Sequence, residues 1–320
     1  MEELGLGYDT LREINPKLIY SSISGYGTTG PKAKAAGYDV IAAAESGFMS
    51  ITGEPDGPPM KTGVAICDIM TGLHAAIGIL ASLYSRDGGP DGARRSGQKV
   101  ESSLFESALS LSFNVGSSFL NSGEEAQRWG TSHPSIGRYS AFMVQARPRV
   151  LPPYPVPYQA FEAQDGYMII GTTNNRQFEK LCKTLELEEL KLDSRFGTNS
   201  QRVKNRVELI EILGERLKSR PASEWVEKLN DLGLPCSRVN SIQEAFQQPQ
   251  THARRMIQEM DCDHSSSGKI HLIGTPIKLS ESPLTIRSAP PALSEHTKEI
   301  LADLGYTDEQ VHQLAKDSVI

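Results

Sequence analysis

The stretch from Leu18 to Asp39, LIYSSISGYGTTGPKAKAAGYD, constrains the fold more than any other part of the sequence. It opens with an apolar, β-branched run that is typical of a strand. Gly25, Gly27 and Gly30 follow at the spacing Gly-x-Gly-x-x-Gly. In α/β proteins this spacing can lead a strand into a helix that binds a dinucleotide. The stretch therefore predicts an α/β fold and raises the question of a nucleotide site.

The residues after the glycines argue against a dinucleotide. Pro31 can begin a helix, but Gly37 follows before a crossover helix could form. The nearest acids, Asp39 and Glu45, come earlier than the position about 20 residues on where a ribose-binding acid is expected. A single Gly-x-Gly-x-x-Gly is a weak signal. We interpret these glycines as residues needed for a tight bend from strand to loop.

Apolar spacing predicts the order of the other elements. Residues at intervals of three and four after Asp68 predict a helix that ends near Arg86, preceded by a Gly/Pro loop (51–63). Two short helices, the first capped by Ser294, are expected at the C-terminus. Further helices are expected at 38–50, 105–120, 174–187, 203–217 and 224–232, and strands at 98–104 and 167–173.

Composition excludes some partners. With 320 residues, 38% of them hydrophobic and 22% charged, the chain can bury a full core and form two domains. Its net charge of -6 provides no basic field for a phosphate backbone, so we expect no nucleic-acid partner. The most apolar window, 73–84, is shorter than the about 20 residues that span a bilayer, so we expect no membrane segment.

Cys67, Cys182, Cys236 and Cys262 have no Cys-x-x-Cys spacing. Their spacing favours a reducing compartment over a zinc site or a disulfide framework. We expect them to be small buried hydrophobes, and we expect no metal site. The N-terminal residues resemble neither a secretory signal nor a transit peptide, and we expect a cytoplasmic or mitochondrial protein.

Asp68 is the candidate for chemistry. It lies between GVAIC and IMTGLH, where the Gly/Pro loop gives way to the long helix. The unpaired amides and the dipole of a helix start keep a carboxylate ionised, and the apolar flanks predict that it is partly shielded from water. An ordinary helix N-cap is the alternative. The residues alone leave both interpretations open.

A series of segments, taken in order, carries a wider pattern. Together they resemble the class III coenzyme A transferase family from Met1 to the C-terminus except for one interval. The resemblance implies a Rossmann-like large domain and a smaller α/β domain. The segments are NPKLIYSSISGYGTTGP, AGYDVIAAAESGFMSITGEPDGPPMKTGVAICDIMTGLHAAIGILASLYSR, SGQKVESSLFESAL, RWGTSHPSI, VPYQAFEAQDGYMIIGTTNNRQFEKLC, DSRFGTNSQRVKNRVELI and PPALSEHTKEILADLGY.

The resemblance implies a reaction. The aspartate of the segment that matches CDIMTG, Asp68, is the implied nucleophile, and coenzyme A moves between carboxylic acids through an aspartyl-CoA thioester. Coenzyme A and acyl-CoA are then substrates, together with a small carboxylic acid, and no permanently bound cofactor is expected. Two chains are expected to interlock as a homodimer. The join of QRWGTSHPSI to VPYQAF looks most like the succinate–hydroxymethylglutarate, or dicarboxylate, type.

The resemblance also implies which residues surround the coenzyme. SISGYGTTGP and the following AGYD are expected along bound coenzyme A, with Gly37 and Tyr38 beside it and Asp39 near Asp68. A core tyrosine and a capping acid are the alternatives. Acyl-CoA racemases of the same superfamily carry His where Tyr38 stands, and a tyrosine with a pKa near 10 is a poor base. Tyr38 therefore favours transfer, and racemase-like isomerisation is an alternative.

A loop that excludes water is expected at GTSHPSI, because water destroys the intermediates. His133, Pro134 and Ser135 are its expected members, and ordinary loop residues are the alternative. Deleting 137–155 would restore HPSIVPYQAF without a gap. We interpret 137–155 as an insertion, either an intron read through in frame or a surface protrusion.

The family pattern also predicts a segment before Met1. Members begin with the first strands of the large domain and with basic residues for the ADP phosphates, so the large domain of this chain is expected to be incomplete. We expect the chain alone to transfer little coenzyme A, and a non-catalytic member that only binds or assembles is an alternative. The expected domains are 1–118 with 275–320, a linker at 119–155, and a small domain at 156–274.

Overall fold

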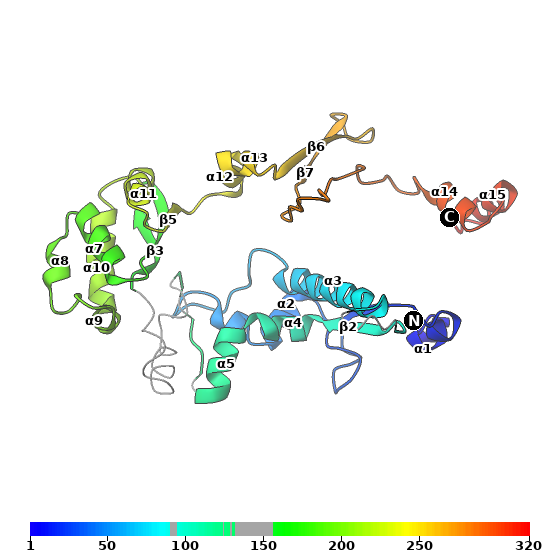
Figure 1. Cartoon of the computed structure of the whole chain (residues 1–320), viewed down its shortest axis with the longest axis horizontal. Coiled ribbons are helices and arrows are strands. Elements are labelled where there is room, and N and C mark those ends of the chain that lie inside the picture. The colour runs from blue at the N-terminus through cyan, green and yellow to red at the C-terminus, as the bar shows by residue number, and fades with distance from the viewer. Residues whose placement is uncertain (90–94, 124, 129, 132–155) are drawn as a thin grey trace. The chain divides into compact units, whose positions relative to one another are not determined.

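The computed structural model describes residues 1–89, 95–123, 125–128, 130–131 and 156–320 (Figure 1). The expected insertion at 137–155 lies outside these residues. Contacts divide the chain into two compact units, Met1–Val239 and Asn240–Ile320. Residues 240–274 thus group with the C-terminal residues, and the domain bounds proposed from the sequence stay a prediction.

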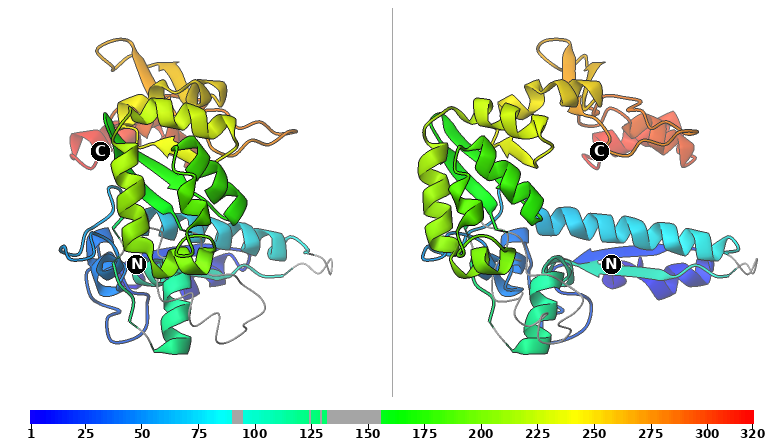
Figure 2. Two further views of the ribbon diagram at one scale, coloured as in Figure 1. Left: turned by 90° about the vertical axis from the view of Figure 1, so that its left-hand side faces the viewer. Right: turned by 60° about the vertical axis from the view of Figure 1, so that its left-hand side comes forward.

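A parallel strand pair with a helical crossover begins the first unit. Strand β1 (Tyr20–Ser24) pairs with β2 (Lys99–Ser103) in register from Tyr20 opposite Lys99 to Ser24 opposite Ser103. Helix α3 (Ile66–Arg86) connects them and runs along the pair (Figure 2). Parallel strands require such a crossover, because a tight turn cannot join them. The pair confirms the predicted α/β class, the strand at 98–104 and the long helix.

Two other predicted helices are shorter than expected. The segment 38–50 forms only α2 (Asp39–Glu45) and the 3-10 helix η2 (Met49–Ile51). The segment 105–120 forms two helices, α4 (Leu104–Leu111) and α5 (Phe113–Ser122). They meet at Ser112, whose hydroxyl donates to the Ala108 carbonyl at 3.4 Å, a bond that bends helices. The remaining helices of this part are η1 (Glu2–Leu4) and α1 (Tyr8–Ile14).

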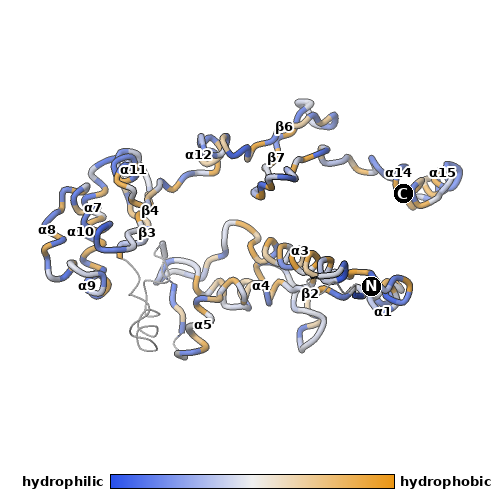
Figure 3. Tube along the Cα trace, viewed as in Figure 1, coloured by the Kyte–Doolittle hydropathy of each residue, from blue (hydrophilic) through white to orange (hydrophobic). Residues whose placement is uncertain are grey.

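The apolar stripe of α3 is exposed, which the sequence did not predict. Its opposite face packs on β1 and β2 and on α4, with small side chains such as Ala75 and Ser82 buried. Hydrophobic residues follow the helix along its length (Figure 3). The exposed apolar residues are Ile69, Leu73, Ile77, Leu80 and Tyr84, at 50%, 51%, 62%, 66% and 64%.

The apolar stretch is longer than the sequence window suggested. Helix α3 has 21 residues and is long and apolar enough to cross a membrane by length and composition alone, with 22% of its most apolar window buried. One such helix is weak evidence for a membrane span, because core helices pass the same test. The sequence analysis predicted an apolar stretch too short to span a membrane. That prediction is wrong, because the helix begins at Ile66, before the window 73–84.

The main hydrophobic core lies in the second half of the first unit. Strands β3 (Tyr158–Ala163), β4 (Gly166–Gly171) and β5 (Cys236–Arg238) form an antiparallel sheet in the order β3-β4-β5. This half confirms the second predicted α/β unit. Its helices are α7 (Asn175–Thr184), α8 (Glu189–Leu192), α9 (Asn199–Lys204), α10 (Arg206–Leu217) and α11 (Ala222–Asp231).

One charged side chain is buried in this core and has no carboxylate partner among the described residues. Arg202 is 0% exposed, and its guanidinium donates to the carbonyls of Val156 and Phe196 at 2.8 and 2.9 Å and to Asn175 Oδ1 at 2.9 Å. The guanidinium also lies 4.3 Å from the ring centroid of Phe178. Burial lowers the pKa of Arg202 to about 10. Neutral acceptors therefore hold this charge in place.

The second unit is a hairpin flanked by short helices. Strands β6 (Ile257–Asp261) and β7 (Lys269–Ile273) pair antiparallel after α12 (Ile242–Gln247) and α13 (Pro249–Ala253). The two predicted C-terminal helices are α14 (Thr297–Asp303) and α15 (Asp308–Lys316). The predicted Ser294 cap is wrong, because Ser294 adopts a φ of 65° and His296 takes the cap position.

The cysteines largely follow the prediction. Cys67, Cys182 and Cys262 are buried, Cys236 is half-buried, and all four are free. Burial raises the pKa of Cys182 to about 12, so its thiol stays neutral. These side chains pack as small hydrophobic groups.

Candidate active site

Asp68 lies in the first turn of α3, as its third residue. It is not the N-cap, because that position belongs to Ala65, whose side chain makes no capping bond. Its carboxylate is exposed, contrary to the partial shielding that the apolar flanks predicted. The reason is that this face of α3 has no covering element among the described residues. Asp68 nevertheless lies at the positive end of the dipole of a 21-residue helix.

Asp39 caps this helix from a distance in the sequence. Its Oδ1 accepts a hydrogen bond from the Cys67 amide at 2.7 Å and a longer one from the Asp68 amide at 3.3 Å. Asp39 begins α2, so its half-buried carboxylate ties the start of α2 to the start of α3. The structure thus places Asp39 beside the backbone of Asp68, and it supplies the acceptor that Ala65 lacks.

Cys67 is the other nucleophilic side chain at this helix start. Burial raises its pKa to about 11, and the nearby charges of Asp39 and Asp68 add to the shift. The thiolate is the reactive form of cysteine, and at neutral pH it is almost absent at this position. Between the two neighbours, the exposed carboxylate of Asp68 is therefore the available nucleophile.

The glycine loop bends back onto the segment that leads to Tyr38. Gly25 and Gly37 touch through their backbones: a Cβ added to Gly25 would lie 2.8 Å from the Gly37 Cα. Gly27 and Gly30 have φ values of 89° and 84°, which other residues rarely adopt. No helix follows the loop directly, since α2 begins only at Asp39. The loop is therefore the predicted tight bend, and Tyr38 beside it is 72% exposed.

Two carboxylates from distant elements hold the loop. Glu101 on β2 accepts hydrogen bonds from the Thr28 amide at 2.5 Å and from the Thr28 hydroxyl at 2.7 Å. These bonds lower the pKa of Glu101, and the bond from the Thr28 hydroxyl contributes most to the shift. Glu45 on α2 accepts from the Tyr26 hydroxyl at 2.6 Å and pairs with Lys32. Sequence reasoning missed both, because Glu101 lies 73 residues from Thr28 and no local signal joins them.

The described residues just before His133 dock on the Gly/Pro loop. Arg128 donates to the carbonyls of Glu54 at 3.1 Å and Ser50 at 3.2 Å, and the Gly130 amide donates to Gly53 O at 3.0 Å. His133, Pro134 and Ser135 themselves lie outside the described residues, so their predicted role stays a prediction.

Other candidate groups near α3 have structural partners. His74 Nδ1 lies 3.1 Å from the Ser107 hydroxyl, which fits the interpretation of a packed histidine. In the part of the chain that the structure describes, no group of three or more His, Cys, Asp or Glu side chains could hold a metal ion. The arrangement offers an exposed carboxylate at a capped helix start, next to an ordered loop.

Comparison with known proteins shows which family the chain matches. The model of the family described as CoA-transferase family III matches residues 1–297. An "Acyl-CoA transferase" of Fusarium pseudograminearum is 42% identical over 100% of this chain and 65% of its own length. The "Succinyl-CoA:glutarate CoA-transferase" of Homo sapiens is 36% identical over 100% of this chain and 67% of its own.

A solved structure is similar to this chain as well. A CAIB/BAIF family protein from Brucella suis superposes with a TM-score of 0.76 at 37% identity, covering 95% of this chain and 72% of that one. The chain spans about two thirds of the length of the curated relatives it matches, 65% and 67%. The match confirms the predicted α/β fold of CoA-transferase family III. The chain belongs to CoA-transferase family III.

Proposed function

We propose that the protein transfers coenzyme A between carboxylic acids, with Asp68 as the covalent nucleophile. The observation that carries the proposal is the exposed Asp68 carboxylate at the start of α3, in a chain of family III. Asp68 lies at the positive end of the α3 dipole, and its neighbour Cys67 is buried as a neutral thiol. An ionised carboxylate suits a transfer that is nearly thermoneutral, because it conserves the energy of the thioester.

The transfer proceeds without net gain or loss of protons. The Asp68 carboxylate attacks the carbonyl carbon of the donor acyl-CoA, forming a mixed anhydride and releasing coenzyme A thiolate. The thiolate attacks the Asp68 carbonyl, which gives the aspartyl-CoA thioester and frees the donor acid as a carboxylate. The acceptor carboxylate attacks that thioester, and the thiolate released then attacks the acceptor's carbonyl. The products are the new acyl-CoA and a regenerated Asp68 carboxylate, in which one oxygen now comes from the acceptor acid.

Asp39 positions Asp68 in this proposal. Its bonds to the amides of Cys67 and Asp68 fix the first turn of α3. Gly37 and Tyr38 line the coenzyme, and Tyr38 is exposed and free to stack on a flat ligand group. His133, Pro134 and Ser135 belong to the loop that excludes water.

Short dicarboxylates are the proposed acids, with succinyl-CoA as donor. The human relative is named for succinyl-CoA and glutarate, which supports this class. We also propose an interlocked homodimer in a reducing compartment, the cytoplasm or the mitochondrion, in keeping with four free cysteines.

Trapping the adduct tests the proposal. The chain, alone and extended with the N-terminal segment of a relative, is mixed with succinyl-CoA and digested for mass spectrometry. A coenzyme A adduct is expected on the peptide containing Asp68 and absent from Asp68→Asn. Asp56→Asn, which changes an exposed loop aspartate, is the matched control. An adduct on another residue, or transfer by Asp68→Asn, would overturn the assignment. Binding without any adduct in either form would favour a non-catalytic member.

A further inference from the structure

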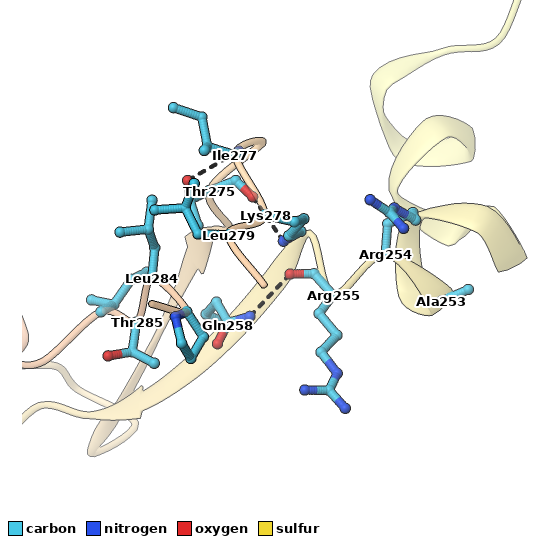
Figure 4. Close-up of a pocket in the computed structure, with 12 residues that line it drawn as sticks. Ala253, Arg254, Arg255, Gln258, Thr275, Ile277, Lys278, Leu279, Leu284 and Thr285 are labelled. Atoms are coloured by element: carbon cyan, nitrogen blue, oxygen red, sulfur yellow. Dashed lines mark hydrogen bonds between the residues drawn. The ribbon is translucent and has the colours of Figure 1, made fainter. Parts of the chain in front are cut away.

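A pocket in the second unit lies outside the proposed site but gathers no charge. Arg254, Arg255 and Lys278 are among the residues that line it. The Arg255 guanidinium is directed away from Lys278, so the pocket offers an anion no converging cations (Figure 4). The outer face of α3, in the first unit, is far more regular, and it begins beside Asp68.

The outer face of α3 is apolar over about four turns. Between Ile69 and Tyr84 the exposed residues recur at intervals of three and one, which places them on one side of the helix. None of them is charged. A helix face in contact with water normally carries charges, as the exposed face of α10 does with Glu208, Glu211 and Glu215. The exposed residues of α3 in this range are Ile69, Gly72, Leu73, Ala76, Ile77, Leu80, Ala81 and Tyr84.

A glycine on this face is not explained by the packing of its own chain. A Cβ added to Gly72 would meet no atom within 4 Å in the part of the chain that the structure describes. Gly78 on the inner face differs, because a Cβ there would lie 2.6 Å from the Val100 side chain of β2. Glycine weakens a helix interior, and it is favoured where another group approaches the backbone closely. A second helix packed on the outer face would be such a group.

The outer face is complementary to itself. In a pair of identical helices related by a two-fold axis, each residue of one copy faces a residue of the other in the same way. An antiparallel pair with its axis between Ala76 and Ile77 sets large side chains opposite large ones and small opposite small at successive levels, so the two helices can interdigitate. The facing pairs are Ile69 with Tyr84, Gly72 with Ala81, Leu73 with Leu80, and Ala76 with Ile77.

Other coverings fit this face less well. The inner face of α3 already packs on β1 and β2, and further strands would extend that sheet in its own plane, below the helix layer. A helix that lies on a membrane carries several Lys or Arg residues beside its apolar face. The one such residue of α3, Arg86, pairs with Asp87. The face therefore fits a second protein surface of the same kind.

We propose that two copies of this chain pack against each other through antiparallel α3 helices. The pairing rests on the homodimer of the proposed function, whose contact it names, and not on the covalent role of Asp68. It sets the C-terminal end of one α3 beside the N-terminal end of the other. Asp68 directly precedes Ile69, so the partner subunit's Tyr84 lies next to the proposed nucleophile and helps to exclude water there. The second copy thus supplies the shielding that Asp68 lacks in a single chain.

Refolding at a series of concentrations tests the contact on the whole chain. The protein is unfolded in urea and refolded, so that even interlocked copies assemble afresh, and its mass is measured by light scattering. We expect a dimer. Ile77→Glu places a charge near the axis in each copy and should raise the concentration for half-dimerisation at least about a hundredfold. Its circular dichroism should not change, because Ile77 is 62% exposed in the single chain. Val207→Glu, at an exposed apolar residue of α10, is the matched control and should assemble normally.

Gly72→Ala separates contact between copies from the stability of one copy. Alanine favours a helix more than glycine does, so the melting temperature of the monomer should stay the same or rise. In the dimer the added methyl group meets the partner subunit's Ala81, and it should weaken assembly at least about tenfold.

A short bis-maleimide linker tests the antiparallel register. The double variant Ile69→Cys, Tyr84→Cys should form covalent dimers, and so should Ile77→Cys near the axis. Ile69→Cys alone should not, because it faces Tyr84. Within one helix the two introduced thiols lie about 22 Å apart, too far for the linker. All variants carry Cys236→Ser, which removes the half-buried native thiol.

The possible results separate the contact from the dimer. A monomer at every concentration would overturn both. A dimer that Ile77→Glu does not weaken, or that the double variant does not cross-link, would keep the homodimer and overturn the α3 contact. A monomer that binds phosphatidylcholine vesicles, or whose Ile77→Cys variant resists maleimide, would also overturn the proposal, since a membrane or another part of the same chain would then cover the face.

Discussion

Replacing Asp39 by alanine is expected to loosen the first turn of α3. The carboxylate accepts two amide hydrogen bonds there, at 2.7 Å from Cys67 and 3.3 Å from Asp68. Losing a helix cap of this kind costs about 0.5–2 kcal/mol. Asp39→Asn keeps an acceptor oxygen and loses the charge beside the helix dipole, a change of about 0.3–1 kcal/mol. Alanine should therefore be the more damaging substitution.

Hydrogen exchange measured by mass spectrometry resolves this loss locally. When reclosing is fast, about 2 kcal/mol corresponds to about a 30-fold faster exchange of the Cys67 and Asp68 amides. The asparagine variant should show at most about a fivefold change. Thr307→Ala, which removes the cap of α15, is the matched control and should leave α3 unchanged. Unaltered exchange at Cys67 in Asp39→Ala, or an equal increase throughout the chain, would refute the capping role.

Three further outcomes follow from single contacts. Arg202→Lys should lower the melting temperature, because leaving a buried carbonyl unpaired costs about 1–3 kcal/mol. An unchanged melting temperature would mean that the three hydrogen bonds of Arg202 do not stabilise the fold. Because the pKa of Cys67 is raised to about 11, its thiol should resist alkylation by iodoacetamide at about pH 8 and react only as the pH approaches this pKa. Rapid labelling of Cys67 at about pH 8 would contradict this and show that the thiol is accessible. Glu101→Gln weakens its bonds to Thr28 by about 1 kcal/mol, so trypsin should cut after Lys34 about fivefold faster; an unchanged rate would mean that Glu101 does not hold the loop.

Local pattern predicted much of the fold. The apolar spacing after Asp68 predicted α3, and the β-branched run after Leu18 predicted β1, because both patterns are local. Short strands were also expected at 98–104 and 167–173, where β2 and β4 lie. The glycine loop was interpreted correctly as a bend, since Pro31 and Gly37 exclude a helix there. Ser294 was a misleading signal, because a serine favours a cap only where its backbone is extended, and here φ is 65°.

The candidate site was only partly predictable. Asp68 could be found because its segment CDIMTG resembles a family motif. Asp39 could be found because the segment AGYD resembles the same family. The contacts that hold the site could not be found, because they join residues far apart in the sequence, as Glu101 and Thr28 do. The exposure of Asp68 also depends on tertiary packing, which periodicity does not specify.

The covalent role of Asp68 is tested most directly by the fate of an isotope label. An acceptor acid carrying heavy oxygen in its carboxylate is supplied with succinyl-CoA to a preparation that transfers coenzyme A. In the mechanism proposed, the acceptor oxygen that bridges the second mixed anhydride remains on the aspartate when the thiolate attacks the acceptor carbonyl. Mass spectrometry should therefore find heavy oxygen in the Asp68 side chain after turnover. Transfer that leaves Asp68 unlabelled, or that labels a different carboxylate, would contradict the mechanism.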